Sequence, residues 1–354
     1  MNSRERVLCS LGHNEPDRVP FMYRDIPEVR RRLLRELTLQ DEDELFRVLG
    51  IDFRWIEPKY TGPSSGEPAS GRTRNIFGVE YIHHEGAAGG YWEPEVFPLR
   101  EVEDPSALEK HPWPRVEWFD FSVMEQQFRR FEGYALMTAP TVYCSPGILS
   151  VIQDLFGMEK TMVDMYANPE LWRRCAEKIM DFNIAFLEKF FYAAKGRIDF
   201  FRIGEDYGTQ RGLLFGPAQY RAFLEPHNRR LAALAKTNGA FYYHHSCGAV
   251  RQLIPDLIDV GVDVLDPVQV QAAGMDLVGL KGDFGGTLCF SGGIDEQGVL
   301  PNGTPQQVRE AVWKTLDVMS PGGGYFLGPT HNFQEDIPTA NIVAMYESAK
   351  EYFQ

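Results

Sequence analysis

The sequence lacks the hydrophobic segments that membrane proteins and secreted proteins carry. No apolar run among its 354 residues is long enough to span a bilayer. Residues 1–6 (MNSRER) place charges where a signal peptide needs an apolar stretch. The 5 cysteines are scattered and odd in number, which favours reduced thiols over a disulfide framework. We therefore expect a cytoplasmic protein that does not contact a membrane.

The sequence also has fewer basic than acidic residues, and it lacks two common phosphate-binding motifs. The chain has 36 Lys and Arg against 50 Asp and Glu, a formal net charge of −14, which argues against a nucleic-acid surface. No G-x-G-x-x-G follows the first expected strand, and G-x-x-x-x-G-K-[ST] does not occur. With 44% hydrophobic residues, the chain can bury a large core, either as one α/β barrel or as two medium domains.

Short apolar runs alternate with helix-like segments along the chain. Eight runs are predicted to be strands, at 18–22, 51–57, 134–139, 199–203, from 241 onward, 262–265, 288–291 and 325–327. This alternation predicts a single (β/α)8 TIM barrel over residues 1–354, although a doubly wound open sheet would show a similar pattern. The missing G-x-G-x-x-G favours the barrel. In such barrels the active site lies at the carboxyl ends of the strands.

Residues 58–133 interrupt this alternation with Pro, Gly and Ser clusters. Within them, 77–82 and 91–97 can pair as a hairpin around the glycine-rich turn 86–90. So long an excursion from one strand end predicts a lid-like insertion over a site. Its aromatic residues offer a docking surface or an aromatic pocket, or else they fold onto the barrel: Tyr81, Tyr91 and Trp92.

The run FYYHHSCG at 241–248 contains the strongest candidates for metal ligands. Side chains two apart on an extended segment share a side, so His245 and Cys247 are expected to face one pocket while His244 faces away. An imidazole nitrogen and a thiolate sulfur suit Zn²⁺. Alone, the pattern also fits a buried cysteine beside a hydrogen-bonded histidine.

The other candidate site residues follow from the same barrel geometry, because they come at or just after the ends of expected strands. With His245 and Cys247 included, the set is Arg24, Glu57, Tyr143, Glu205, Asp206, His245, Cys247, Asp266, Gln269, Asp295, His331 and Asn332.

Several motifs resemble those of the uroporphyrinogen decarboxylase superfamily over nearly the whole chain. They are EPDRVP at 15–20, HSCG at 245–248, LIPDLI at 253–258, DPVQ at 266–269, GGID at 292–295 and GGGY at 322–325. The resemblance implies a (β/α)8 barrel. It also implies one of two activities: decarboxylation of a tetrapyrrole, or zinc-dependent methyl transfer to or from a corrinoid, as in methylcorrinoid:coenzyme M and aromatic O-demethylase enzymes.

Two departures from the superfamily pattern favour the methyltransferase branch. Decarboxylases carry an Arg-rich motif after the first strand, whereas FMYRDI at 21–26 offers only Arg24, with Arg202 and Arg211 as the few further cations. The methyltransferases bind zinc through His-x-Cys and a second Cys just after the last strand. Here GPTHN at 328–332 has His331 at that place. The resemblance therefore implies a zinc site formed by His245, Cys247 and His331.

Three protein ligands leave a fourth zinc position for a substrate oxygen or thiol. Glu205 is expected to be a fourth ligand or a general acid, and Asp206 to orient a histidine; the alternative is that both cap a loop. Tyr143 joins them as a catalytic candidate. The residues expected to line the substrate pocket are Arg24, Glu57, Asp266, Gln269 and Asn332, with a turn-forming role as the alternative for Asp266.

The chain carries no Asp-x-His-x-x-Gly, the cobalt-binding motif of corrinoid carriers. We therefore expect a separate corrinoid carrier protein as the partner and a small thiol, methyl ether or methyl amine as the substrate. Two alternatives remain: a metal-free decarboxylase or lyase that acts on a small or tetrapyrrole acid, and a non-catalytic barrel that binds a corrinoid protein.

Overall fold

The computed structural model describes residues 1–63, 71–84, 90–145 and 147–354. Its main feature is one curled, parallel, seven-stranded sheet in the order β1-β7-β8-β9-β10-β11-β12. These strands are β1 (Phe53–Ile56), β7 (Ala135–Thr138), β8 (Phe200–Gly204), β9 (Phe241–His245), β10 (Val264–Val268), β11 (Cys289–Ile294) and β12 (Tyr325–Pro329). The expected α/β class and parallel barrel sheet are confirmed.

The first expected strand, 18–22, is not a strand. Phe21 forms only an isolated parallel bridge with Leu327. Its N–H donates to the Asp52 carboxylate at 2.8 Å, and Pro20 has no N–H, so the ladder cannot extend. Even so, Met22 N–H reaches Leu327 O at 2.8 Å, and Asp52 N–H reaches Phe21 O at 3.1 Å. This short segment therefore connects β12 to the start of β1 and closes the ring.

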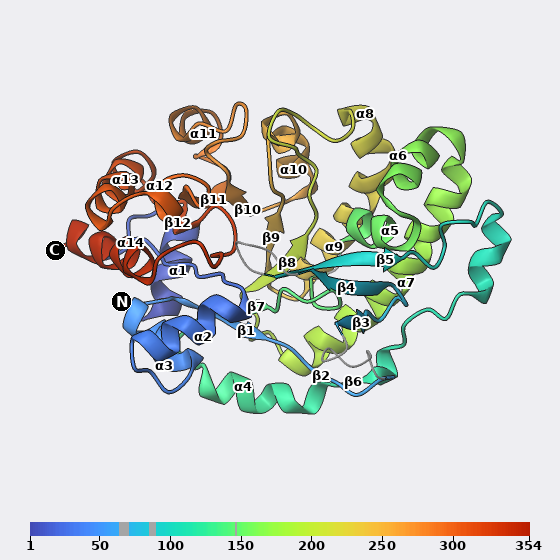
Figure 1. The fold of residues 1–354 in the computed structure, drawn as a ribbon, viewed down its shortest axis with the longest axis horizontal. Coiled ribbons are helices and arrows are strands. Elements are labelled where there is room, and N and C mark those ends of the chain that lie inside the picture. The colour runs from blue at the N-terminus through green and yellow to red at the C-terminus, as the bar shows by residue number, and fades with distance from the viewer. Residues whose placement is uncertain (64–70, 85–89, 146) are drawn as a thin grey trace.

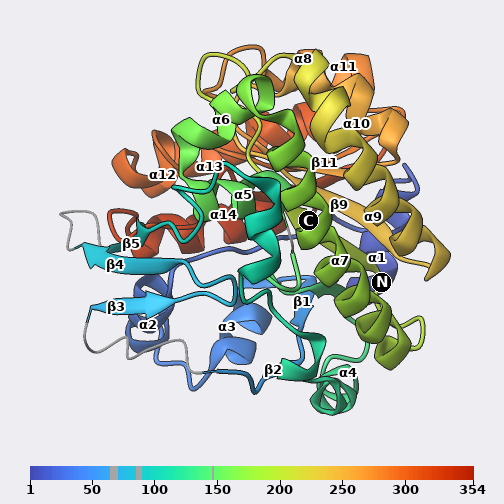
Figure 2. The ribbon, with the colours of Figure 1, turned by 90° about the vertical axis from the view of Figure 1, so that its right-hand side faces the viewer.

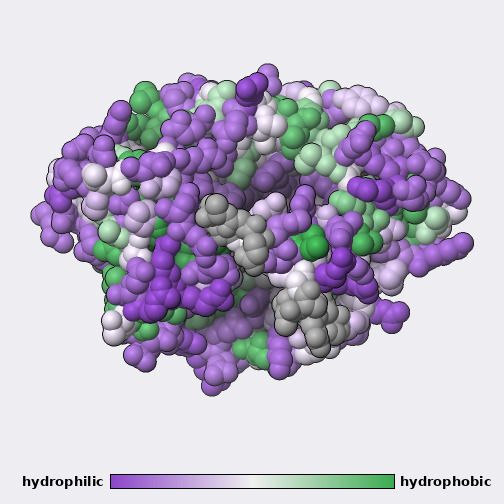
Figure 3. All heavy atoms as spheres, in the orientation of Figure 1, coloured by the Kyte–Doolittle hydropathy of each residue, from purple (hydrophilic) through white to green (hydrophobic). Residues whose placement is uncertain are grey.

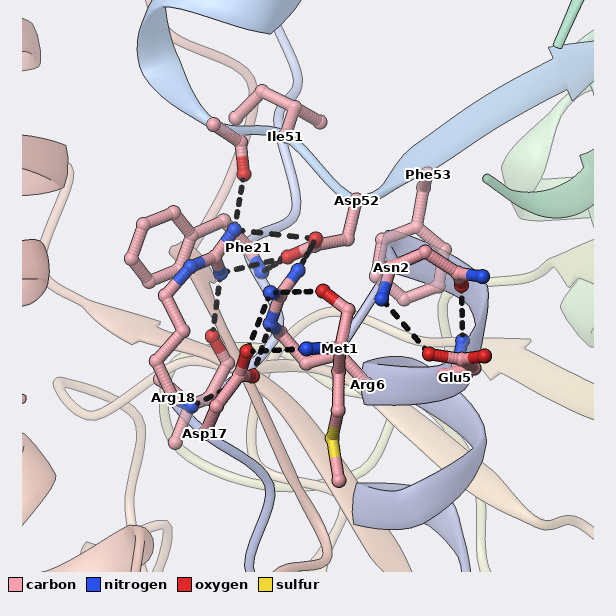
Figure 4. A network of polar contacts seen from close by, with 12 residues as sticks. Met1, Asn2, Glu5, Arg6, Asp17, Arg18, Phe21, Ile51, Asp52 and Phe53 are labelled. Atoms are coloured by element: carbon pink, nitrogen blue, oxygen red, sulfur yellow. Dashed lines mark hydrogen bonds and ion pairs between the residues drawn. The ribbon is translucent and has the colours of Figure 1, made fainter. Parts of the chain in front are cut away.

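The side chain of Asp52 holds this closure in place. Its fully buried carboxylate accepts hydrogen bonds from Arg6 Nη1 at 2.7 Å and from Arg18 Nη1 at 2.8 Å. Figure 4 shows the two guanidinium groups meeting at Asp52, with Asp17 bound to Arg6 beside them. These charge-assisted hydrogen bonds offset the loss of water around the buried side chain. The network joins the N-terminal segment to β1.

The amino end of the barrel is filled by apolar side chains. Helix α1 (Ser3–Leu11) begins with a capping box between Asn2 and Glu5 and packs Val7 and Leu11 against this end. The interior side chains that they join are Met22, Phe53, Ala135, Met137, Phe200, Tyr243, Val264, Cys289 and Phe326. In Figure 2, α1 lies on the side of the molecule opposite to β3, β4 and β5. The polar side chains of the barrel interior are therefore found towards the carboxyl ends of the strands.

Helices surround the sheet (Figure 1). They are α2 (Pro27–Glu36), α3 (Glu42–Leu49), α5 (Ile148–Phe156), α6 (Met158–Ala167), α7 (Pro169–Ala194), α8 (Pro217–Gln219), α9 (Glu225–Thr237), α10 (Ile254–Val260), α11 (Leu277–Phe284), α12 (Val299–Asn302), α13 (Pro305–Met319) and α14 (Thr339–Tyr352). Among the described residues, we find no helix with both the length and the apolar character needed to cross a bilayer.

The excursion between β1 and β7 forms structure of its own. It contains β2 (Lys59–Tyr60), β3 (Arg72–Arg74), β4 (Glu80–His84), β5 (Tyr91–Val96), β6 (Phe119–Asp120) and α4 (Met124–Arg130). The expected hairpin is confirmed, since β4 and β5 pair antiparallel, while residues 86–89 of its expected turn lie outside the described residues. The Tyr81 hydroxyl donates to Asp154 on α5, so Tyr81 folds onto the barrel, whereas Tyr91 and Trp92 stay exposed. A lid function remains a prediction.

Candidate functional site

The inward positions of the central strands change from apolar to polar towards their carboxyl ends. Phe200 belongs to the apolar interior layer, and Arg202 is the next inward residue of β8. Parallel pairing sets Gly204 beside His245, and His245 beside Asp266. The register therefore places the polar side chains of His245 and Asp266 beside Gly204, one inward position beyond Arg202, above the apolar layer.

His245 and Cys247 share a side, as expected. Nε2 of His245 lies 3.6 Å from Sγ of Cys247. His244 points the other way and packs its ring 5.2 Å from the ring of Tyr207. Among the described residues, neither ring nitrogen of His244 has a hydrogen-bond partner, and burial lowers its pKa to about 3, so this histidine is neutral.

Asp206 completes a group of possible metal ligands. Asp206, His245 and Cys247 each offer one ligand atom, and these atoms lie within 4.8 Å of one another. Oδ1 of Asp206 accepts the Cys247 N–H at 2.8 Å and lies 3.8 Å from His245 Nε2. The sequence indicated Asp206 as a residue that orients a histidine. The structure places it beside the other two donors, and we call these three residues the donor group.

Two glycines let the loops of the donor group touch. A Cβ atom on Gly248 would lie 2.5 Å from the carbonyl carbon of Gly208, and Gly248 has a φ of +85°, which favours glycine. The Ala249 N–H also donates to Thr209 O at 2.8 Å. Gln269, expected in the substrate pocket, accepts the Gly248 N–H through Oε1 at 2.7 Å. The loop after β9 is therefore held against the loop after β8.

Asp266 orients the ring of His245 through Nδ1, the nitrogen opposite the one that faces Cys247. Its Oδ2 lies 2.8 Å from His245 Nδ1 and accepts from Arg24 Nη1 at 2.7 Å. Burial alone would raise the pKa of Asp266, but Arg24 and His245 outweigh it and hold this pKa well below its usual range. Burial and Arg202 lower the pKa of His245. A neutral His245 thus donates Nδ1–H to the carboxylate and turns the Nε2 lone pair towards the donor group.

The guanidinium group of Arg24 is already bound by other groups of the protein. Besides Asp266, it donates through Nη2 to Pro329 O at 2.9 Å, and its side chain is 7% exposed. A substrate carboxylate would have to compete with Asp266 for this guanidinium. The role of Arg24 that the structure shows is to neutralise the carboxylate behind His245.

His331 and Asn332 follow β12. His331 is half-buried, and its pKa is lowered by burial and by the nearby charge of Arg24. In the described part of the chain, its ring nitrogens do not fall within the donor group, whose third member is Asp206. His331 therefore lies near the donor group, and its role as a zinc ligand stays a prediction, as does substrate contact by Asn332.

Glu205 points away from the donor group. Its carboxylate, 2% exposed, accepts the Leu149 N–H at the N-terminus of α5 at 2.6 Å. It also accepts the hydroxyl of Tyr207, in the loop after β8. A Cβ on Gly147 would lie 2.6 Å from Glu205 Cγ, so this approach needs glycine there. Burial raises the pKa of Glu205 to about 7, and its hydrogen bonds oppose that shift. These contacts make Glu205 a cap of the N-terminus of α5, whereas the alternative expected from the sequence was a loop cap.

Tyr143 and Glu57 bind each other. The Tyr143 hydroxyl donates to Glu57 Oε2 at 3.2 Å, and burial raises the pKa of both groups. Tyr143 lines a pocket of about 430 Å³ with Tyr60 and Trp118, beneath the excursion. Glu57 lines a neighbouring pocket of about 360 Å³ with Arg54. The two residues thus lie between two cavities, neither of which is lined by the donor group.

Two further groups were not among the predicted site residues, although Arg202 had been noted as a cation. Arg202 projects into the barrel from the middle of a hydrophobic strand, where alternation with Phe201 and Ile203 was the available signal. Glu296, just after β11, has its pKa raised to about 7 by burial and by Asp336 and Asp295. No periodic pattern marks Glu296, because its environment is set by loops.

A closed parallel barrel wrapped by helices, with polar side chains at the carboxyl ends of its strands, is the architecture of (β/α)8-barrel enzymes. The sequence model of the uroporphyrinogen decarboxylase (URO-D) family matches residues 140–352, and the chain belongs to this family. The matched range includes the donor group, Asp266 and His331. Arg24 and Glu57 lie before it.

A solved methyltransferase from Methanosarcina mazei has a similar structure, with a TM-score of 0.67 over 100% of both chains and 15% sequence identity. At this identity the likeness shows a shared fold. The sequence finds no significant match among curated proteins. Family membership, which the sequence motifs predicted, is therefore confirmed, and the choice of reaction depends on the site.

Proposed function

We propose that the protein is a zinc-dependent methyltransferase that moves a methyl group between a small substrate and a corrinoid held by a separate carrier protein. The substrate is a thiol, a methyl ether or a methyl amine. The observation that carries the proposal is the donor group, which offers a carboxylate oxygen, an imidazole nitrogen and a cysteine sulfur within 4.8 Å. The family and the likeness to a methyltransferase fold support it.

The donor group fits zinc in chemistry, and one pair of its ligand atoms also fits in spacing. Tetrahedral Zn²⁺ with ordinary Zn–S and Zn–N bond lengths separates those two ligand atoms by roughly 3.6 Å. His245 Nε2 and Cys247 Sγ lie 3.6 Å apart. A carboxylate behind the ligating histidine is the usual outer-shell partner of zinc, and Asp266 occupies that place. Bound zinc would lower the pKa of a substrate thiol, or polarise a substrate ether oxygen.

The remaining residues prepare the site for such a substrate. Asp266 keeps the His245 proton on Nδ1, and Arg24 keeps Asp266 ionised. Gln269 and the paired glycines fix the loop of Cys247. His331 is neutral at pH 7 because its pKa is lowered, so it can accept the proton of a thiol or supply a further ligand.

The decarboxylase alternative has weaker support. A tetrapyrrole acid presents several carboxylates, which need several free cations. Arg24 is bound to Asp266 and Pro329, which leaves Arg202 as the inward cation without an ion pair among the described residues. One guanidinium suits a substrate with one acidic group better than a substrate with many.

Zinc content and methyl transfer test the proposal together. Protein purified without oxygen should hold about one zinc per chain, and His245→Ala and Cys247→Ala should lose it. Cys175→Ala is the matched control, since Cys175 is buried on α7, and it should keep its zinc. The zinc-loaded protein should demethylate methylcobalamin with a thiol acceptor, as followed by absorbance. Zinc without any methyl transfer to thiols, or from methyl ethers and amines, would leave the non-catalytic alternative.

A further inference from the structure

A cavity of about 360 Å³ lies at the carboxyl ends of β1 and β7, where the excursion begins. Side chains of α2, α3, β1 and α4 line it, together with the turn after β7. Its lining contains no member of the donor group. Figure 3 shows the face that carries the excursion as hollowed near its centre. A cavity of this volume can hold a small molecule.

Two arginines line the cavity, and both are paired with carboxylates. Arg30 lies 2.5 Å from Asp25 through Nη2 and 2.6 Å from Glu42 through Nη1. Nε of Arg54 lies 3.4 Å from Oδ1 of Asp43. The positive charges of both arginines are therefore balanced by these three carboxylates.

Glu57 is the remaining charged residue of the cavity wall. Its carboxyl group accepts the Tyr143 hydroxyl at 3.2 Å. Within the described ranges, no Lys, Arg or His lies at ion-pair distance from it. Burial raises the pKa of Glu57, and the Tyr143 hydrogen bond opposes that shift. A cation that arrives from solvent would therefore stabilise the ionised carboxylate.

Helix α4 holds the backbone of Glu57 in place. Gln127 Oε1 accepts the Glu57 N–H at 3.0 Å, and Gln127 Nε2 donates to Glu57 O at 2.7 Å. The side chain of Gln127 also lines the cavity. Together with the Tyr143 hydroxyl, these bonds fix the carboxyl group without giving it a positive partner. A group fixed in this way can bind a ligand without first being ordered.

Trp55 supplies an aromatic ring beside this carboxyl group. Trp55 and Glu57 are two residues apart on an extended segment, so they share a side, and Trp55 pairs in register with the interior residue Met137. Among the residues that the structure describes, no cation or other ring stacks on Trp55, whereas Phe46 already faces Arg54 at 5.0 Å. The half-buried indole is therefore free to contact a ligand.

An unpaired carboxylate beside an indole ring is the combination that recognises alkylated ammonium ions. We propose that this cavity binds a small organic cation, an alkylated ammonium, between the Glu57 carboxylate and the Trp55 ring. The apolar part of the wall, with Phe131 and Pro140, favours such a cation over a hydrated metal ion. The site is separate from the donor group and goes beyond the proposed function.

Binding of a matched pair of alcohols tests this assignment. Choline and 3,3-dimethyl-1-butanol have nearly the same shape, and only choline carries a positive charge. By calorimetry on metal-free protein at pH 8, the wild type should bind choline at least tenfold more tightly than the neutral alcohol. Glu57→Gln should lose this preference, and Trp55→Leu should weaken choline binding about fivefold or more. Glu101→Gln is the control, because Glu101 is exposed elsewhere in the excursion, and it should keep the wild-type ratio.

Three results would overturn the proposal: equal or undetectable binding of the two alcohols by the wild type, an unchanged preference in Glu57→Gln, or displacement of bound choline by equimolar potassium chloride. The first would mean that Glu57 is held as a neutral acid, and the last would mean an inorganic cation site. If Glu57→Gln does not fold, the wild-type ratio and Trp55→Leu still decide. Since the measurement uses metal-free protein, a failure of zinc binding or methyl transfer leaves its outcome unaffected.

Discussion

Nδ1 of His245 lies 2.8 Å from Oδ2 of Asp266, and the same oxygen accepts from Arg24. Asp266→Asn should therefore leave the buried Arg24 guanidinium without its anion. We expect a loss of about 3 kcal/mol in the free energy of unfolding, together with weaker zinc binding because His245 loses its orienting carboxylate. Urea unfolding and zinc titration measure the two effects.

The matched control for that variant is Asp256→Asn. Asp256 pairs with Arg221, whose side chain is 58% exposed, so this change should cost under about 1 kcal/mol. Equal losses in the two variants would show that the pair of Arg24 and Asp266 behaves like a surface ion pair.

The third zinc ligand can be assigned by comparing Asp206→Ala with His331→Ala. The structure groups Asp206 with His245 and Cys247, so Asp206→Ala should lower zinc affinity by 100-fold or more. His331→Ala should lower it by less than tenfold and act mainly on methyl transfer. Competition with a zinc chelator measures both affinities. The reverse order would restore the His-Cys-His set that the family resemblance implies.

Glu205 should make stability depend on pH. Its folded-state pKa of about 7 lies above the ordinary value near 4.5, so the folded chain holds a proton that the unfolded chain releases between these values. Stability therefore falls as pH rises from about 4.5 to 7, by roughly 3 kcal/mol in total. Glu205→Gln, which is neutral throughout, should match the wild type at pH 4.5 and exceed it at pH 8.

Urea unfolding at the two pH values measures that difference. Glu188→Gln, at an exposed position on α7, is the control and should change little at either pH. A Glu205→Gln variant that is less stable than the wild type at pH 8 would mean that the ionised carboxylate stabilises the N-terminus of α5 by more than its burial costs.

Gly248→Ala should separate the two loops of the donor group. The added Cβ would meet the Gly208 backbone at 2.5 Å and sit on a residue with φ +85°, so the loop must move. We expect a tenfold or larger loss of zinc affinity with a modest loss of stability. Gly212→Ala is the control, because open space surrounds that position in the neighbouring loop. Unchanged zinc affinity in Gly248→Ala would show that loop contact is not needed.

Much of the fold could be predicted because barrel strands are short, apolar and separated by helices. The prediction failed at 18–22, since an N–H that the ladder needs is bound by the side chain of Asp52, 31 residues further on. At the start of β8, a side chain again binds a backbone N–H that is distant in sequence. Asp199, expected in the strand, precedes it, and its carboxylate accepts the Leu136 N–H. Such side-chain bonds to distant backbone have no local signature.

The site was predictable where it depends on one strand. Period-two alternation placed His245 and Cys247 on one side and His244 on the other. Asp206 and Glu205 are neighbours in sequence, yet one joins the donor group and the other meets α5. Glu205 is held by the Leu149 N–H, and Asp206 accepts the Cys247 N–H. These partners lie in other segments of the chain, which sequence spacing cannot identify.

The proposed zinc site requires one sulfur and at least one nitrogen to bind the same zinc ion. X-ray absorption at the zinc edge of the loaded protein tests this directly. We predict one sulfur at about 2.3 Å with nitrogen and oxygen ligands at about 2.0–2.1 Å, and loss of the sulfur in Cys247→Ala. A first shell of nitrogen and oxygen only, unchanged in Cys247→Ala, would contradict the proposed zinc site.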